Sequence, residues 1–214
     1  MIAENLKSTK KQLASGISLV AVSKTKPKED ILEAYEVGQR IFGENKTQEL
    51  VLKAAILPKD IEWHMIGHLQ TKKVKHIAPF VSLIHGVDSW KLLQEINKRA
   101  RQNKRVIDCL LQIHIAQESN KFGLNEEEAE ALLLPAQNLV NIRIVGLMGM
   151  ATFTDDKNQI HIEFAGLKKT FDRFQTTRPE LDVLSMGMSG DYQIAIKEGS
   201  TMVRVGSAIF GDRQ

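Results

Sequence analysis

The sequence has few of the features that mark disulfide-bonded, exported or membrane-spanning proteins. Cys109 is the only cysteine among 214 residues, so no disulfide can form within the chain, and we expect a reducing, cytoplasmic environment. No apolar run approaches the length that spans a bilayer. The N-terminal segment is too polar for a signal peptide, so we expect neither export nor a membrane partner.

A strong excess of one charge is also lacking. The formal net charge is +3, and the lysines are scattered apart from a basic cluster within residues 70–77. Aromatic residues make up only 6% of the chain and do not interleave with that cluster. We therefore interpret the cluster as a solvated helix face and expect no nucleic-acid partner.

What the sequence does contain is a regular alternation of short β-rich runs and helical patterns, with no low-complexity linker between them. The β-rich runs lie at 17–23, 40–42, 61–66, 81–85, 106–115, 142–148, 181–185 and 201–205. The helical patterns follow an N-terminal helix and lie near 28–38, 45–57, 70–78, 88–103, 125–138, 158–176 and 190–198. This alternation predicts parallel crossovers in an α/β fold, with residues 1–214 forming one domain.

Eight such units predict a closed (β/α)8 barrel, the TIM-barrel architecture, with the N-terminal helix covering the remaining gap. A doubly wound open sheet is the alternative, but it would have to place eight strands and leave two edges exposed. In a barrel, the functional residues lie at the carboxyl ends of the strands and in the loops that follow them. The predicted strand ends therefore define where to look for a site.

Glycine and serine gather after the last two predicted strands. The first loop, SMGMSG at residues 185–190, contains Ser185 and Ser189, and the second begins with Gly206 and Ser207. Glycine lets backbone N–H groups approach a ligand, serine adds a hydroxyl donor, and a helix N-terminus favours an anion. Turn glycines and serine caps would explain either loop alone. Two such loops at consecutive strand ends favour a phosphate site.

Two cationic side chains are predicted to enter the same barrel mouth. Period-two alternation places Arg204 inside the last strand, and it places Lys24 on the same face of the first strand as Val22. Arg204 either pairs with a carboxylate elsewhere in the barrel or binds a ligand acceptor. Lys24 either extends to solvent or has a pKa lowered by desolvation, which frees its amine to attack a carbonyl. Beside a phosphate site, the second interpretation suggests a Schiff base to a phosphorylated aldehyde.

Other polar residues near the strand ends carry weaker signals. Asn45 is predicted to cap the helix at 45–57, and its amide can also face the mouth. Ser89 and Asn125 precede later helical patterns as candidate caps. His64 and His68 straddle a strand end, so their spacing does not indicate a metal site.

Five segments carry a resemblance to one family: AVSKTKP at 21–27, FGEN at 42–45, WHMIGHLQ at 63–70, GLMGMAT at 146–152 and the long block at 184–211. They resemble the pyridoxal phosphate homeostasis proteins, a family similar in fold to the N-terminal domain of alanine racemase. The resemblance covers nearly the whole chain. It implies a barrel without the additional β-domain of the racemase, and pyridoxal 5′-phosphate (PLP) as the cofactor.

The resemblance also implies roles for individual residues. The matched positions are a Schiff-base lysine at Lys24, an asparagine near the cofactor at Asn45, phosphate-binding positions at Ser189, Gly206 and Ser207, and an arginine facing the pyridine nitrogen at Arg204. Ser185 is only a neighbour in the same motif. No metal ligand is implied.

Two positions depart from the family pattern. Asn120 and Gly86 each stand where the family commonly has a serine. Both are expected in loops that line the mouth opposite the phosphate. The departures therefore bear on the outer pocket and leave the lysine and phosphate assignments intact.

Three functions are compatible with a reactive lysine beside a phosphate site. The family implies a protein that holds PLP reversibly on Lys24 and helps to control vitamin B6 levels. Apo-enzymes that require PLP are then its candidate partners. The alternative is a PLP-dependent amino-acid racemase resembling alanine racemase. The third is a Schiff-base aldolase that acts on a phosphosugar without a cofactor.

Holding is favoured over catalysis by an arginine at the pyridine nitrogen and by the scarcity of tyrosine. Arginine stays protonated and favours an unprotonated ring nitrogen, which makes the ring a weaker electron sink. Racemisation needs two bases, and the resemblance implies that alanine racemase takes the second, a tyrosine, from its additional domain. Only Tyr35 and Tyr192 occur here, and neither is expected in the mouth. We therefore expect a PLP-binding monomer that is not an enzyme.

Overall fold

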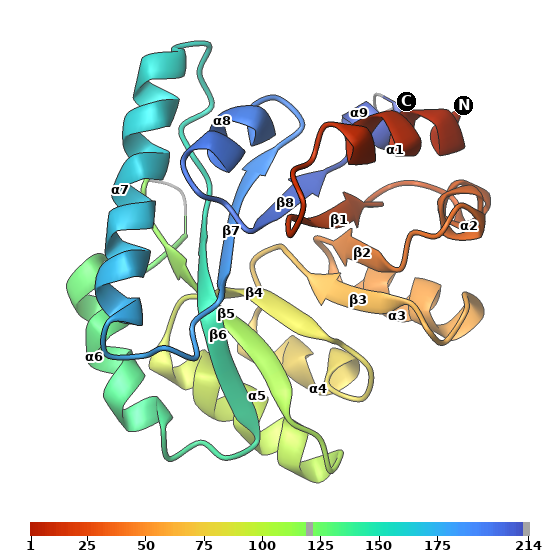
Figure 1. Cartoon of the computed structure of the whole chain (residues 1–214). Helices are drawn as coiled ribbons and strands as arrows, with labels where there is room; N and C mark the ends of the chain where they lie inside the picture. Colours follow the sequence, from red (N-terminus) through yellow and green to blue (C-terminus); the bar gives the residue numbers. More distant parts are fainter. Residues whose placement is uncertain (119–121, 212–214) are drawn as a thin grey trace.

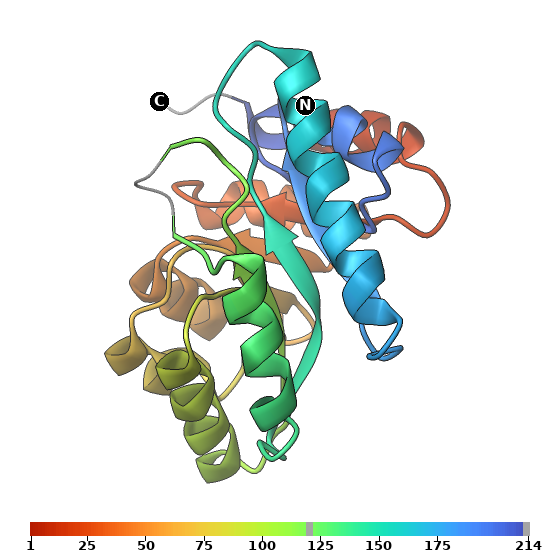
Figure 2. The ribbon, with the colours of Figure 1, turned by 90° about the vertical axis from the view of Figure 1, so that its left-hand side faces the viewer.

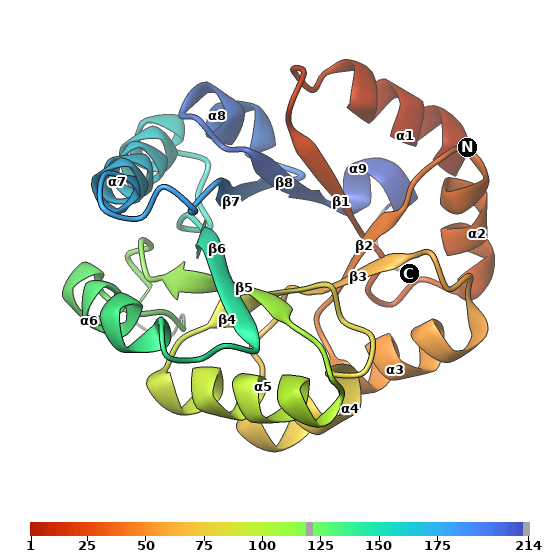
Figure 3. The same ribbon diagram turned by 60° about the horizontal axis from the view of Figure 1, so that its bottom comes forward.

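The computed structural model describes residues 1–118 and 122–211, and it confirms the predicted closed barrel. Parallel strands follow one another in chain order, and the last pairs with the first to close the ring. Figure 3, which looks into the barrel, shows the helices outside the strands. The strands are β1 (Ser18–Val22), β2 (Ile41–Glu44), β3 (Glu62–Met65), β4 (Leu83–Val87), β5 (Ile107–Ile113), β6 (Ile142–Gly149), β7 (Val183–Met188) and β8 (Met202–Val205).

The helices lie close to their predicted ranges. They are α1 (Ile2–Lys11), α2 (Lys28–Glu36), α3 (Thr47–Ile56), the 3-10 turn η1 (Thr71–Lys73) continuing into α4 (Val74–Ile77), α5 (Trp90–Gln102), α6 (Glu126–Ala136), α7 (Lys157–Gln175), α8 (Tyr192–Lys197) and α9 (Ser207–Phe210). Within the described part of the chain, none is long and apolar enough to cross a membrane.

Helix α1 covers the gap beside the barrel closure, as the sequence predicted. It lies against α9, and Figure 1 shows the two helices, one from each end of the chain, side by side at the top of the barrel. The side-chain amide of Asn5 donates to the carbonyl oxygen of Ile209 at 3.1 Å. The first and last helices therefore form one joined layer over the β1–β8 seam.

The helix caps confirm two predictions and contradict a third. Ser89 accepts a hydrogen bond from the backbone of Leu92, and Asn125 forms a capping box with Glu128. Asn45 does not cap α3, because that helix begins one residue later and Lys46 occupies the N-cap position without a side-chain bond. Asn45 is instead left in the segment between β2 and α3.

Side chains alternate between two apolar layers along each strand. Val20 and Val22 of β1 and Met202 of β8 belong to the small cluster inside the barrel. Val203 and Val205 belong to the larger cluster between the strands and the helices. The predicted period-two assignment of β1 and β8 is therefore confirmed, and Arg204 points inward.

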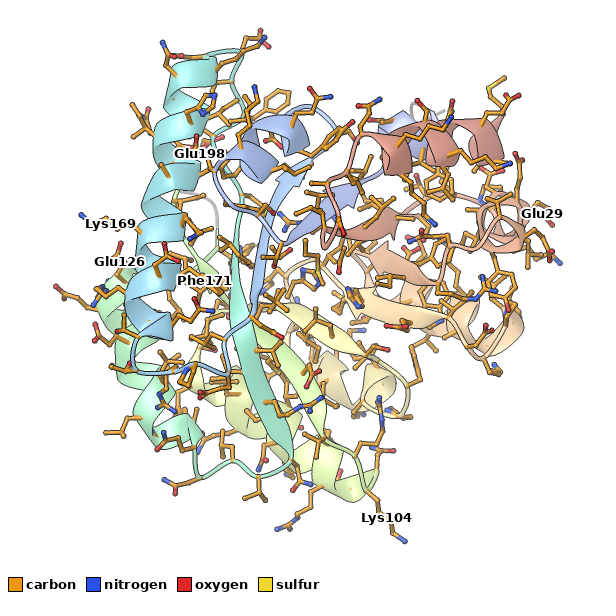
Figure 4. All side chains as sticks on the ribbon, viewed as in Figure 1. Glu29, Lys104, Glu126, Lys169, Phe171 and Glu198 are labelled. Carbon is orange, nitrogen blue, oxygen red and sulfur yellow. The ribbon has the colours of Figure 1, made fainter. Side chains whose placement is uncertain are left out.

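Helix α7 shows how the outer layer is built. Phe171 is buried and points toward the strands, whereas Lys169 is exposed on the opposite side of the helix (Figure 4). The helix runs alongside β6 (Figure 2). Arg173 forms an ion pair with Glu126 at 3.0 Å, which joins α7 to α6.

Gly146 lets β6 pass unusually close to β7. It pairs in register with Val183, and a methyl group at this position would lie 1.7 Å from the Val183 carbonyl oxygen. No side-chain rotation relieves a clash between a Cβ atom and backbone. This strand pair therefore requires glycine.

Gly146→Ala is expected to lower the free energy of unfolding by roughly 3 kcal/mol, because the strands must separate to admit the methyl group. Gly166→Ala is the matched control, since Gly166 lies in α7 with nothing within 4 Å of the added carbon. That variant should gain about 0.5–1 kcal/mol from helix propensity. Urea unfolding of both variants measures the difference, and equal stabilities would contradict the steric argument.

Candidate functional site

The six predicted site residues lie at one rim of the barrel, at the carboxyl ends of β7, β8, β1 and β2. Register pairs β1 with both neighbours, Ala21 with Val205 and Val22 with Gly43. Lys24 therefore emerges between the loop that begins at Gly206 and the segment that contains Asn45. Segments far apart in the sequence thus form one site.

The loops after β7 and β8 are joined by a hydrogen bond from the backbone N–H of Gly206 to Ser189 Oγ, at 3.0 Å. Around this bond the backbone offers unused donors. Within residues 1–118 and 122–211, no acceptor is recorded for the N–H groups of Ser189, Gly190, Ser207 and Ala208. Unpaired N–H groups at the start of a helix and in a glycine turn are suited to bind an anion.

Arg204 is only 3% exposed and is held by neutral oxygens. Its guanidinium donates to Ser185 at Oγ (2.6 Å) and at the carbonyl oxygen (2.9 Å), and to the carbonyl oxygen of Gly149 (3.0 Å). Burial lowers the pKa of Arg204 to about 10, partly opposed by the Asp191 charge, so it remains a cation at neutral pH. No ion pair of Arg204 is found among the described residues, so the first of the two alternatives, a pair with a carboxylate, is not formed there.

Two buried histidines extend this contact across the barrel interior. Ser185 Oγ lies 3.1 Å from His85 Nδ1, and His85 Nε2 lies 3.1 Å from His64 Nδ1. A guanidinium only donates, so the Ser185 hydroxyl accepts from Arg204. The two rings continue this contact as a chain of hydrogen bonds from the cation to His64.

The histidine pair was missed at the level of sequence, although a signal existed. Period-two alternation puts His85 on the same face of β4 as Leu83, and Leu83 belongs to the interior cluster. Ser185 also differs from its first interpretation, since it is fully buried beneath the mouth and contacts Arg204 and His85. It is therefore not part of the loop that offers N–H groups to a phosphate.

Lys24 is half-buried, and both of its neighbours are tied to other elements. Ser23 Oγ donates to Glu44 Oε1 at 2.6 Å, and the backbone N–H of Thr25 donates to Glu49 Oε1 at 2.6 Å. The lysine therefore sits on a segment whose backbone is fixed to β2 and α3.

The opposite side of the rim consists of close backbone contacts. A methyl group at Gly67 would lie 2.5 Å from the Asn45 carbonyl oxygen, and one at Gly86 would lie 2.8 Å from the Gly67 carbonyl oxygen. The glycine at the Gly86 departure thus allows β4 to approach the backbone of the segment that follows β3. The second departure, Asn120, lies outside the described residues.

Neither tyrosine reaches the mouth. Tyr192 donates its hydroxyl to Gln12 Oε1 at 2.6 Å, at the end of α1, and Tyr35 donates to Asp60 at 2.8 Å near the surface. Both rings thus lie on the helix side of the strands, as the sequence predicted.

Comparison with known proteins decides the family. A family model described as alanine racemase, N-terminal domain, matches residues 1–214. The pyridoxal phosphate homeostasis protein of Aquifex aeolicus (strain VF5) is 39% identical over 198 residues, covering 92% of this chain and 87% of that protein. The chain belongs to the pyridoxal phosphate homeostasis protein family. This confirms the resemblance drawn from the five sequence segments.

Solved structures agree at two levels of similarity. PipY of Synechococcus elongatus PCC7942 with PLP bound has a TM-score of 0.91 at 36% identity, covering 99% of this chain and 100% of that one. Alanine racemase from Bartonella henselae has a TM-score of 0.76 at 16% identity, covering 99% of this chain and 58% of the racemase. The racemase likeness concerns the fold alone, whereas PipY shares much of the sequence as well.

The buried histidines should make this member of the homeostasis family sensitive to acid. Burial lowers the pKa of His64 from 6.5 to about 3. Burial also lowers the pKa of His85, and the nearby charges of His64 and Arg204 lower it further. Below pH 6.5 the unfolded chain therefore binds protons that the folded chain does not. The free energy of unfolding should fall with falling pH by on the order of 1 kcal/mol per pH unit for each histidine.

Urea unfolding between about pH 7 and about pH 5 measures this slope. His64→Gln should make the slope shallower than in the unsubstituted protein. His76→Gln, which alters an exposed histidine, is the control and should leave it unchanged. A slope that is the same in all three proteins would contradict the assignment of neutral, buried rings.

Proposed function

We propose that this chain binds PLP through Lys24 in a single barrel domain and takes part in vitamin B6 homeostasis in the cytoplasm. The family supports this role, since its members are named pyridoxal phosphate homeostasis proteins and PipY was solved with PLP bound. The proposed partners are PLP itself and apo-enzymes that require it. The assignment of individual residues is argued from the rim of the barrel.

The observation that carries the proposal is the set of unpaired backbone donors beside Lys24. Four N–H groups, on Ser189, Gly190, Ser207 and Ala208, surround the hydrogen bond between Ser189 and Gly206. A phosphate group presents oxygen acceptors to such donors, and its negative charge is favoured there. The residues present therefore fit the phosphate of PLP.

The second part of the fit is the buried charge. Arg204 brings a positive charge into the interior with neutral partners only, and an anionic ligand at the mouth offsets it. Arg204 points inward from the strand whose end carries the phosphate loop, which supports its proposed position at the pyridine nitrogen. Asn45, half-buried on the far side of Lys24, is proposed to contact the cofactor ring.

When bound, PLP supplies an aldehyde carbon that an amine can attack. The Lys24 amine would be the group that holds that carbon, with the carbonyl oxygen released as water together with both amine protons. Lys24 is thereby proposed to hold the ligand covalently, while Ser189, Gly206 and Ser207 hold its phosphate. The covalent bond is reversible by hydrolysis, as a homeostatic reservoir requires.

Holding is proposed in place of catalysis because the described residues offer no tyrosine as a second base. Tyr192 and Tyr35 both donate to residues on the helix side of the barrel. Arg204 cannot accept a proton and so favours the less electron-withdrawing form of the ring. Both observations weigh against racemisation.

Lys24→Ala tests the covalent site. The unsubstituted protein incubated with PLP should be yellow, lose that colour on borohydride reduction, and carry the cofactor mass on Lys24. Lys24→Ala should lose the reducible adduct yet keep weak binding through the phosphate. Lys26→Ala is the control, because Lys26 donates to the carbonyl oxygen of Phe210 and should not be needed. A reducible adduct in Lys24→Ala would overturn the assignment.

A second measurement separates the holding protein from an enzyme. The PLP-loaded protein should pass its cofactor to a PLP-requiring apo-enzyme, which regains activity. It should also leave amino acids unracemised, since the described residues offer no tyrosine as a second base. Racemisation that depends on Lys24 would favour the racemase-like alternative.

A further inference from the structure

The residues on either side of Lys24 are fixed by a buried cluster of charges on β2 and α3. Lys53 Nζ donates to the carbonyl oxygen of Ser23 at 2.7 Å, and to Glu44 Oε1 at 2.8 Å. It also donates to Glu49 Oε1 at 2.7 Å, the oxygen that accepts the Thr25 backbone N–H. The contacts of this cluster therefore bracket Lys24 on both sides.

Two members of the cluster, Glu44 and Lys53, form an ion pair that is almost fully buried. The side chain of Glu44 is completely inaccessible, and that of Lys53 is 9% exposed. Burying such a pair carries a desolvation cost that can exceed the attraction, so the pair is weak evidence for stability. Consistent with this cost, burial raises the pKa of Glu44 against the opposing bonds from Lys53 and Ser23. A role other than stability is therefore worth seeking.

The backbone at Lys24 needs an external restraint. The Lys26 N–H donates to the Ser23 carbonyl oxygen at 3.0 Å, so residues 23–26 form a turn with Lys24 and Thr25 at its centre. Thr25 has φ of 66°, in the left-handed region that disfavours a β-branched residue. The segment does not adopt this turn by local preference, and the bonds to Ser23 and Thr25 hold it.

We propose that Glu49, Lys53 and Glu44 are positioning residues, which hold the turn at residues 23–26 so that the Lys24 amine is aimed at the aldehyde carbon of a phosphate-anchored ligand. This inference rests on the proposed function. Lys53 and Glu49 contact the backbone before and after Lys24, and Glu44 accepts from the Ser23 hydroxyl. The phosphate loops lie on other strands. The cluster therefore controls covalent capture separately from phosphate binding.

Glu49→Ala is the primary test, because Glu49 is the most exposed member of the cluster and alanine is a good helix former. Two quantities are measured. One is the rate at which PLP becomes reducible by borohydride on Lys24. The other is the dissociation constant of pyridoxine 5′-phosphate, which carries the phosphate and ring but has no aldehyde and cannot bind covalently.

The proposal predicts that Glu49→Ala slows covalent capture by about tenfold, since small errors in alignment have large effects on rate. The dissociation constant of pyridoxine 5′-phosphate should stay within about twofold, because the phosphate loops are untouched. Glu95→Ala is the matched control: Glu95 forms the same i,i+4 ion pair on α5, with Arg99 at 2.6 Å, away from the rim. It should change neither quantity.

The double variant Glu44→Gln/Lys53→Met removes both buried charges of the cluster together, so neither is left buried without the other. It should slow capture at least as much as Glu49→Ala and again spare pyridoxine 5′-phosphate binding. An unchanged capture rate in both variants would overturn the proposal. A parallel loss of capture and of pyridoxine 5′-phosphate binding would also overturn it, because that is the result of general unfolding. An unsubstituted protein with no adduct on Lys24 would instead refute the proposed function.

Discussion

A guanidinium buried among neutral partners is the constraint around which the barrel interior is organised. Arg204 is only 3% exposed, and its guanidinium donates hydrogen bonds to oxygens of Ser185 and Gly149. A second positive charge nearby would be unfavourable, and the adjacent histidines are neutral over the physiological range. The polar interior is therefore a continuous series of hydrogen bonds that leaves one positive charge for an anionic ligand to balance.

The rim divides binding among neighbouring strands. The loops after β7 and β8 offer donors for an anion, β1 ends in an amine, and β2 and α3 fix the backbone from which that amine extends. Each task depends on different residues, although the strands are adjacent. Anchoring and covalent capture can therefore vary independently within one small barrel.

The sequence predicted the barrel because its signals are local. Alternating patterns located each strand to within a few residues, and period two placed Arg204 and the interior valines correctly. It failed at Asn45, because a cap depends on where the chain turns after β2, and a one-residue difference moved the N-cap to Lys46.

The interior contacts were beyond local patterns. The contact between His85 and Ser185 joins residues 100 positions apart, and the contact between Lys53 and Ser23 joins residues 30 apart. Period-two alternation predicts which face of its strand each side chain occupies. It does not predict which of the inward-facing side chains contact one another. Closeness across a barrel depends on strand stagger, which the sequence pattern does not encode.

The pairing of β1 with β8 determines the stage of folding at which the site is completed. β1 is among the first strands to leave the ribosome and β8 is the last, and α1 and α9 meet over their junction. Contacts between segments so distant in sequence form late in folding. The amine on β1 is thus available early, but the anion-binding loop beside it exists only after the ring has closed. The complete site therefore forms only with ring closure, and a ligand that binds it favours the closed ring over partly folded forms.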